Sequence, residues 1–327
     1  MGTSDLRDQL QATLGDAYRI ERELPGGGMS RVFVAEEARF HRRVVVKLLP
    51  PELAGGVSTE RFRREIEMLG KMYHPRIVPI LSMDEDGDLL YYTMPYVAGE
   101  SLRDRLDREK QLPVDDAVRI AREIAEALGC AHRLGIIHRD VKPGNVLLAD
   151  DSAVVTDFGI ARAVERSAQR LSVTSSGFTL GTPTYMSPEQ ASGHRDLDAR
   201  SDLYALGCVL YEMLAGEPPF TGPNPQAVIA RHMSDTPRSI RLVRREVPEQ
   251  LERLVMRLLA KSPADRYPTA ERVVELLGHP DRMSVVTRRF LAVTPRRAAR
   301  AGLVGAALVI VGATGLLTWT RARDGRA

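Results

Sequence analysis

The sequence predicts an α+β protein of two lobes, in which strands dominate the first lobe and helices dominate the second. From Tyr18 to about Tyr96, short apolar runs of strand length prevail, and one helical stretch interrupts them. From Ser101 to about Leu277, apolar residues recur mostly at helical spacing. Because strands precede helices instead of alternating with them, we expect the two kinds of element to be segregated in space.

Local patterns place the individual elements. Strands of the first lobe are predicted at residues 32–35, 43–49 and 89–94. The clearest helix of the second lobe is predicted at residues 114–134. Ile120, Ile124 and Leu128 share one face of this helix, and the glycine that follows it marks its end.

The composition is that of a folded protein rather than a disordered one. Of 327 residues, 43% are hydrophobic and 27% are charged. Cys130 and Cys208 lie in apolar helical patterns, so buried free thiols are expected, with a reactive thiol as the alternative. Two such cysteines imply no disulfide framework, and no spacing of Cys or His residues indicates a metal site.

The charge is distributed unevenly along the chain. Nine Arg and two Asp follow residue 280, a local charge of +7, so the preceding residues carry −4 and the whole chain +3. This distribution argues against a nucleic-acid-binding domain and favours a tail that lies close to anionic lipid.

Residues 301–320 form a run of twenty residues without a charge, AGLVGAALVIVGATGLLTWT. This length matches a hydrocarbon core of about 30 Å. Arg residues flank both ends of the run, and Trp319 stands where an interfacial aromatic residue is expected. We therefore expect a transmembrane helix; the alternative is a buried core helix.

Two segments of the first lobe carry residues that suit phosphate chemistry. Residues 24–32 read LPGGGMSRV, and such glycines let backbone amides cradle a phosphate, although a plain hairpin turn is the alternative. Lys47 interrupts an apolar strand, so it should be partly buried and need a partner, unless it points to water from an edge strand. Glu65 is the candidate partner because it shares an apolar helical face with Phe62 and Leu69.

The strongest pattern lies in the second lobe. Residues 138–145 read HRDVKPGN, and Asp157-Phe158-Gly159 begins twelve residues after Asn145. Carboxylate and amide oxygens are hard ligands that suit Mg²⁺, and a lysine adds positive charge for a phosphate. Both motifs at this spacing, after the glycines, Lys47 and Glu65, are not a coincidence.

In this order the motifs resemble those of the protein kinase superfamily, specifically the bacterial eukaryotic-like (Hanks-type) serine/threonine kinases. The resemblance covers about four-fifths of the chain, roughly residues 18–279. It implies the two-lobed protein kinase fold, with a β-rich N-lobe and a helical C-lobe. It also implies ATP between the lobes, Mg²⁺ as the metal with Mn²⁺ as an alternative, and protein substrates.

The resemblance also implies a role for each matching residue. Asp140 would accept the proton of the substrate hydroxyl and Lys142 would stabilise the γ-phosphate, while Asn145 and Asp157 would bind Mg²⁺. Lys47 would hold the α- and β-phosphates and pair with Glu65. The residues implied for ATP binding are Leu24, Gly26, Gly27, Gly28, Val32, Lys47, Glu65, Met94, Tyr96 and Val97. Met94 would lie at the back of the adenine pocket.

Residues 181–189, GTPTYMSPE, resemble the end of a kinase activation segment. The resemblance implies structural roles for three residues: Glu189 would pair with Arg266, and Asp202 would anchor the catalytic loop. Lys142 and the Thr that follows Gly181 resemble serine/threonine rather than tyrosine kinases.

A phosphorylation switch is predicted upstream of this segment, at Thr174, Ser175, Ser176 and Thr179. Arg139 precedes Asp140, and a cation beside a catalytic carboxylate suggests that an anion arrives to pair with it. The alternative is that these hydroxyls form a polar loop without a regulatory role.

The glycine loop departs from the family pattern. Of the three positions that carry glycine in the family, the chain has Pro25, Gly27 and Ser30. Pro25 lacks an amide hydrogen, which could weaken nucleotide binding. A membrane-tethered pseudokinase is kept as the alternative function; the residues that would distinguish an active kinase from it, Lys47, Asp140, Asn145 and Asp157, are all present. A small-molecule kinase is disfavoured because it would lack the activation segment.

The boundaries expected from these observations divide the chain into five parts. They are an N-terminal extension (1–17), a kinase domain (18–280; N-lobe 18–94, hinge 95–98, C-lobe 99–280), an Arg-rich linker (281–300), the transmembrane helix (301–320) and a short extracytoplasmic tail (321–327). Because ATP is cytoplasmic, the kinase domain should face the cytoplasm at the inner membrane. The expected partners are protein substrates, ATP, the lipid bilayer and a second copy for autophosphorylation in trans, but no nucleic acid.

Overall fold

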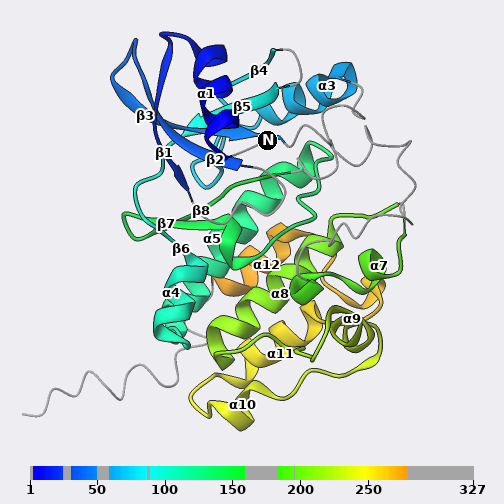
Figure 1. Ribbon diagram of the computed structural model, residues 1–327. Helices are drawn as coiled ribbons and strands as arrows, with labels where there is room; N and C mark the ends of the chain where they lie inside the picture. The colour runs from blue at the N-terminus through cyan, green and yellow to red at the C-terminus, as the bar shows by residue number, and fades with distance from the viewer. Residues whose placement is uncertain are drawn as a thin grey trace, which may run out of the picture. The chain divides into compact units, whose positions relative to one another are not determined.

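An antiparallel sheet of five strands forms the first part of the structure (Figure 1). The computed structural model describes residues 3–24, 31–49, 59–86, 89–158, 183–194 and 196–278. In spatial order the strands are β1 (Tyr18–Leu24), β2 (Arg31–Glu37), β3 (Arg42–Leu48), β5 (Leu89–Pro95) and β4 (Ser82–Asp86). The three strands predicted from the sequence are therefore confirmed, with limits that differ by one or two residues.

Strand β3 separates two layers of the core because successive side chains point to opposite faces of a strand. Val44 and Val46 pack in one apolar cluster and Val45 in another. The helix α1 (Thr3–Leu14) covers the first face and buries Leu10 completely. Residues 1–17 were expected to be an extension of the domain, yet this helix contributes to its core.

Helix α3 (Thr59–Gly70) supplies apolar residues to the cluster on the other side of the sheet. Ile66 and Leu69 are 4% and 5% exposed and join Val45 in this cluster. Because residues three apart share one face of a helix, Ile66 and Leu69 lie on the face that α3 buries, while the side chains of Phe62 and Glu65 lie outside the described residues.

The second part of the structure is helical, as the sequence predicts. Its helices are α4 (Leu102–Glu109), α5 (Val114–Arg133), α7 (Pro188–Ala191), α8 (Arg200–Ala215), α9 (Pro225–Ser234), α10 (Ile240–Val243), α11 (Glu249–Leu258) and α12 (Ala270–Leu277). The predicted helix at 114–134 is confirmed as α5. All fifteen residues of α8 after Arg200 are buried, so this helix is the centre of the helical part.

A small sheet and a continuous core connect the two parts. The sheet consists of β6 (Glu100–Ser101), β7 (Val146–Ala149) and β8 (Ser152–Val155). Residues of β3 and β5 belong to the same buried cluster as residues of α5 and α8. The backbone amide of Val78 also donates to the carbonyl of Val155 at 2.9 Å, which ties the first part to β8.

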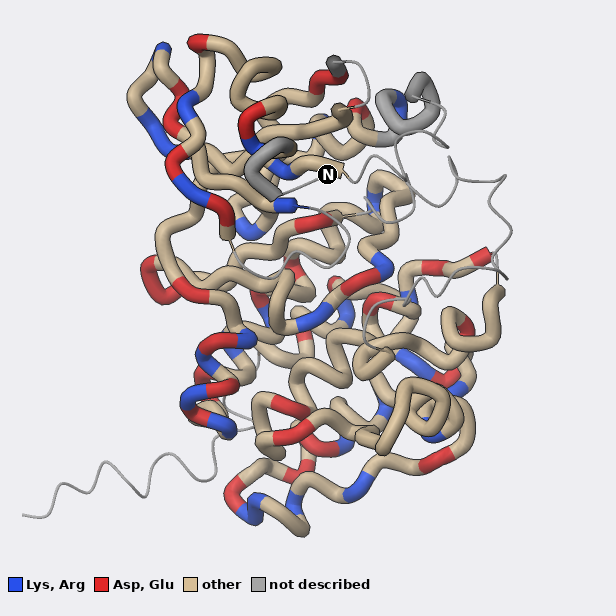
Figure 2. The backbone as a smooth tube through the Cα atoms, in the orientation of Figure 1, with Lys and Arg blue, Asp and Glu red and all other residues tan. Residues whose placement is uncertain are grey.

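Opposite charges lie close together along β2 and β3 (Figure 2). In the antiparallel pair of β2 and β3, Glu37 lies opposite Arg42 and Glu36 opposite Arg43. Arg42 and Glu37 form an ion pair at 2.5 Å. Such exposed pairs contribute only about 0–1 kcal/mol each, so the apolar layers rather than these charges stabilise the sheet.

The described residues contain no helix that is both long and apolar enough to cross a membrane. The predicted span at residues 301–320 lies outside the described residues, as do the Arg-rich linker and the tail. The transmembrane helix therefore stays a prediction.

Candidate active site

The glycine-rich segment lies between β1 and β2. Leu24, the last residue of β1, is opposite Val32 in the antiparallel pair, so the chain turns back between them. Gly26, Gly27 and Gly28 lie outside the described residues. The structure thus places the two ends of the predicted phosphate loop, while the roles of its glycines stay predictions.

Lys47 points away from the cluster that holds Val46 and toward the second part of the structure. Its side chain is 13% exposed, and Nζ lies 2.6 Å from Oδ2 of Asp157. The expected partner, Glu65, is a residue of α3, but its side chain lies outside the described residues, so that pair stays a prediction. The sequence analysis did not anticipate the ion pair with Asp157.

Asp202, near the start of α8, holds the backbone of the loop that carries the HRD motif. Its carboxylate accepts hydrogen bonds from the backbone amides of His138 and Arg139, both at 2.8 Å. Nε2 of His132 also lies 2.8 Å from this carboxylate. Arg139 has a φ of +69°, a strained conformation for a residue with a side chain, so these bonds hold a backbone that would otherwise relax. This geometry matches the anchoring role expected of Asp202.

His138 connects this loop to the segment that carries Asp157. Its Nδ1 accepts from the backbone amide of Asp140 at 3.2 Å, so the ring proton is on Nε2. Nε2 donates to the carbonyl of Thr156 at 2.9 Å. The ring also packs against Phe158, with 4.5 Å between the centroids. One buried imidazole therefore sets the relative position of the two motifs.

Asp140 lies between a cation and an amide. Its Oδ2 accepts from Nζ of Lys142 at 2.7 Å and from Nδ2 of Asn145 at 3.0 Å. The side chain of Asp140 is 45% exposed, so the carboxylate can meet a substrate from solvent. Nδ2 of Asn145 also donates to the carbonyl of Asp140, which leaves the amide oxygen as the atom that can face a cation.

The predicted hinge leads from β5 into the small sheet. Met94 is 9% exposed, and Tyr96 and Val97 are partly buried against the main core. A Cβ atom on Gly99 would lie 2.0 Å from the carbonyl oxygen of Leu148, so only glycine allows this close approach. The hinge residues thus occupy the junction between the two parts, and their contacts with adenine stay predictions.

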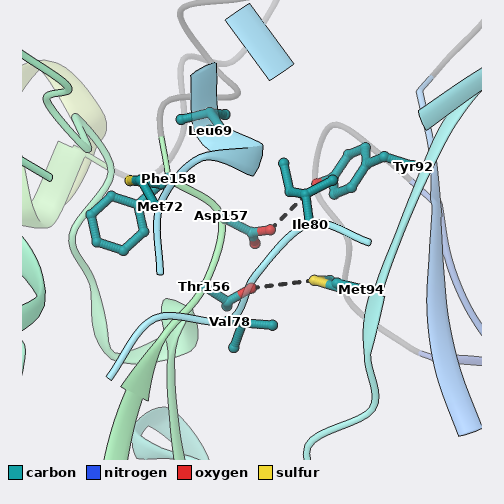
Figure 3. A pocket seen from close by; sticks show the side chains of 9 residues that line it. All are labelled: Leu69, Met72, Val78, Ile80, Tyr92, Met94, Thr156, Asp157 and Phe158. Atoms are coloured by element: carbon teal, nitrogen blue, oxygen red, sulfur yellow. Dashed lines mark hydrogen bonds between the residues drawn. The ribbon is translucent and has the colours of Figure 1, made fainter. Parts of the chain in front are cut away.

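A small cavity of about 10 Å³ lies behind this junction (Figure 3). Its lining comes from α3, the segment after it, β5, and the DFG motif with the residue before it: Leu69, Met72, Val78, Ile80, Tyr92, Met94, Thr156, Asp157 and Phe158. Oγ1 of Thr156 lies 3.5 Å from Sδ of Met94. Met94 lines this cavity, and its expected place at the back of the adenine pocket stays a prediction. The sequence analysis did not single out Tyr92, whose hydroxyl lies 3.5 Å from Oδ1 of Asp157.

Glu189 and Arg266 form a buried, bidentate ion pair. Nη1 and Nη2 of Arg266 donate to the two carboxylate oxygens at 2.6 and 2.8 Å. Burial raises the pKa of Glu189, but hydrogen bonds from Arg266 and Ser201 outweigh it and lower the pKa overall. The pair fixes the end of the predicted activation segment to the helical core.

A second network at this end of the segment was not predicted. The hydroxyl of Tyr185 donates to Glu212 at 2.6 Å, and Nη1 of Arg103 donates to the same carboxylate at 2.7 Å. These residues come from three distant segments, and no local spacing in the sequence signals their contact. Upstream of Tyr185, the four predicted phosphorylation sites lie outside the described residues.

Comparison with known proteins supports the expected family. A model of the protein kinase domain matches residues 18–280. The serine/threonine-protein kinase PknB of Mycobacterium leprae is 43% identical over 263 residues, which cover 79% of this chain and 42% of that protein. A probable serine/threonine-protein kinase of Clostridium perfringens is 36% identical over 263 residues, which cover 80% of this chain and 38% of that protein. The chain thus spans about two-fifths of the length of these relatives, and it belongs to the protein kinase domain family.

Proposed function

We propose that the chain is a serine/threonine protein kinase that transfers the γ-phosphoryl group of ATP to Ser or Thr hydroxyls of proteins. The observation that carries this proposal is the junction of two short loops. Asp140, with Lys142 and Asn145 on its carboxylate, lies in one loop, and Asp157, with Lys47 on its carboxylate, lies in the other. The names of the relatives, all serine/threonine-protein kinases, support the choice of acceptor.

The reaction assigned to these residues transfers a phosphoryl group from one oxygen to another. The oxygen of the substrate hydroxyl attacks the γ-phosphorus, the bond to the bridging oxygen breaks, and ADP leaves with that electron pair. The hydroxyl proton passes to the carboxylate of Asp140. Lys142 and Lys47 place positive charge near the phosphates, so the protein acts mainly through position and electrostatics.

The residues present suit Mg²⁺, which would reduce the negative charge of the phosphates when bound. The described residues contain no group of three or more His, Cys, Asp or Glu side chains that could hold a metal. Mg²⁺ commonly uses one or two carboxylates together with substrate phosphates and water, so such a group is not required. Asp157 offers a carboxylate and Asn145 an amide oxygen, and both ligands are hard oxygens.

The test is phosphoryl transfer by the full-length chain, purified in detergent with ATP and Mg²⁺ and a general protein substrate. Asp140→Asn should keep nucleotide binding and lose transfer by orders of magnitude, because the proton acceptor is removed while the phosphate contacts remain. Asp8→Asn removes an exposed carboxylate of α1 and is the matched control. Transfer by Asp140→Asn at the rate of the control would overturn the proposed role, and no transfer by the wild type would favour the pseudokinase.

The proposal includes attachment to the cytoplasmic membrane through residues 301–320. Its support is the run of twenty uncharged residues between Arg residues. With the kinase domain in the cytoplasm, two copies held in one membrane could phosphorylate each other in trans.

Extraction from membranes tests this attachment. The full-length chain should stay in the membrane fraction at high salt and in alkaline carbonate, because a spanning helix is integral. Val309→Asp with Val311→Asp should release it, since an acidic residue at the centre of a span costs about 2.5–3.5 kcal/mol. Release of the wild type by carbonate would instead indicate peripheral binding through the Arg-rich tail.

A further inference from the structure

Tyr92 and Lys47 form a cross-strand pair that reaches a single carboxylate. They lie directly opposite each other in the antiparallel pair of β3 and β5, so their side chains emerge side by side on one face. Nζ of Lys47 lies 2.6 Å from Oδ2 of Asp157, and the hydroxyl of Tyr92 lies 3.5 Å from Oδ1. Figure 3 shows the phenol directed at the carboxylate from β5.

The environment of Tyr92 makes its hydroxyl a hydrogen-bond donor. The side chain is 1% exposed, and a buried phenol needs an acceptor. In the described part of the chain, Asp157 is the acceptor that this hydroxyl reaches.

Asp157 needs such support because its backbone is strained. Its φ is +67°, in the left-handed region that residues with side chains rarely adopt. Strained residues persist only where their surroundings hold them. The preceding residue, Thr156, is held through its carbonyl by His138 and through its hydroxyl by Met94, while the carboxylate of Asp157 is held by Lys47 and approached by Tyr92.

We propose that Tyr92 is a positioning residue for the carboxylate of Asp157. This inference rests on the proposed function, in which Lys47 turns to the phosphates of ATP and Asp157 binds Mg²⁺. The phenol of Tyr92 would then be the donor that still orients the carboxylate. Because a carboxylate oxygen has two lone pairs, it can accept from the phenol and also coordinate a cation. Hydrogen bonds to a ligating carboxylate typically change metal affinity 10- to 100-fold.

The experiment compares wild type with Tyr92→Phe, which removes one oxygen and keeps the ring. Tyr91→Phe makes the same change on the same strand, where the side chain packs on the opposite face with the α1 cluster, and is the matched control. A fluorescent ADP analogue reports binding to the full-length chain in detergent, first without metal and then as Mg²⁺ is added. Electron paramagnetic resonance of Mn²⁺ with ADP measures the metal directly, without any need for catalysis.

For Tyr92→Phe we expect the Mg²⁺ concentration at half-maximal binding to rise about tenfold, with metal-free binding of the analogue unchanged. Tyr91→Phe should match the wild type in both measurements, and the thermal unfolding midpoint shows whether either variant is folded. An unchanged Mg²⁺ midpoint in folded Tyr92→Phe would overturn the inference. The inference would also be overturned if Tyr92→Phe weakened binding of the analogue as much without metal as with Mg²⁺. That result would mean that the phenol shapes the nucleotide pocket. If the wild type bound no nucleotide with either metal, the proposed function itself would fail.

Discussion

Removing the charge of Glu189 should destabilise the helical part of the protein strongly. The side chain of its partner, Arg266, is 0% exposed, and all five of its N–H donors have acceptors. Two of these bonds go to Glu189, and the other three go to the carbonyls of Ala260, Arg200 and Lys261. A guanidinium in this position has no access to water if the carboxylate is neutralised.

The magnitude follows from what Glu189→Gln leaves behind. Removing one partner of a buried ion pair lowers the free energy of unfolding by about 3–5 kcal/mol, because the other charge stays buried without compensation. The three carbonyl acceptors of Arg266 remain in the variant, and Ser201 can still donate to the new side chain. We therefore expect the low end, a loss of about 3 kcal/mol in the free energy of unfolding.

Urea unfolding followed by circular dichroism measures this loss. Glu249→Gln is the control, because Glu249 forms an ion pair with Arg253 in which both side chains are more than half exposed. That pair should contribute about 0.3–0.5 kcal/mol. The double variant Glu189→Leu with Arg266→Met should remain destabilised, because it removes the buried charge but also leaves the carbonyls of Ala260, Arg200 and Lys261 without their donor. If Glu189→Gln cost no more than Glu249→Gln, the argument from burial would be wrong.

Three further predictions concern other parts of the chain. Leu10→Ala should cost about 2–5 kcal/mol in urea unfolding because it leaves a cavity between α1 and the sheet, and a cost near zero would show that α1 is not part of the core. Burial and then the charge of Lys261 lower the pKa of His232 to about 4. As the pH falls below 6.5, His232 is therefore protonated in the unfolded chain before it is protonated in the folded one. Stability should therefore drop by up to about 3 kcal/mol between pH 6.5 and 4, and His232→Gln should flatten this slope in pH-dependent unfolding. Alanine at all four hydroxyl residues among 174–179 should lower activity on an added protein substrate; unchanged activity, with no phosphate on the wild type, would remove the predicted switch.

The predicted switch stays untested, and Arg139 is the residue from which it was inferred. Its Nε is buried and has no hydrogen-bond partner among the described residues. The sequence showed only that a cation precedes Asp140. A phosphate on one of the predicted sites among residues 174–179 would supply a charge-assisted partner, which is the physical route by which phosphorylation orders such a loop.

The sequence predicted the elements well because they depend on local patterns. Strand period, helix period and the glycine after α5 are properties of neighbouring residues, and the structure confirms the elements that they predict. The HRD and DFG motifs are likewise recognisable in the sequence because the residues of each motif lie within a few positions of one another. The predicted transmembrane span and phosphorylation sites lie outside the described residues, so their accuracy stays open to experiment.

Contacts between distant segments were harder to predict. Arg103 and Glu212 meet across 109 positions, and nothing in either segment signals the other. Tyr92 differs from them because one signal was available. It stands two residues before Met94 in a predicted strand, so the two side chains share a face, and Met94 was already expected at the back of the pocket.

The carboxylate of Asp157 shows why the geometry of this site belongs to the tertiary fold. Lys47 reaches it from β3 and Tyr92 from β5, while His138 holds the residue before it from the HRD loop. Each donor compensates part of the strain at one backbone position, so the loss of one donor raises the importance of the others. Substitutions at Lys47 and Tyr92 should therefore not be additive, because both act on the same carboxylate. The cross-strand register of β3 and β5, rather than any single motif, is what brings the two donors to that carboxylate.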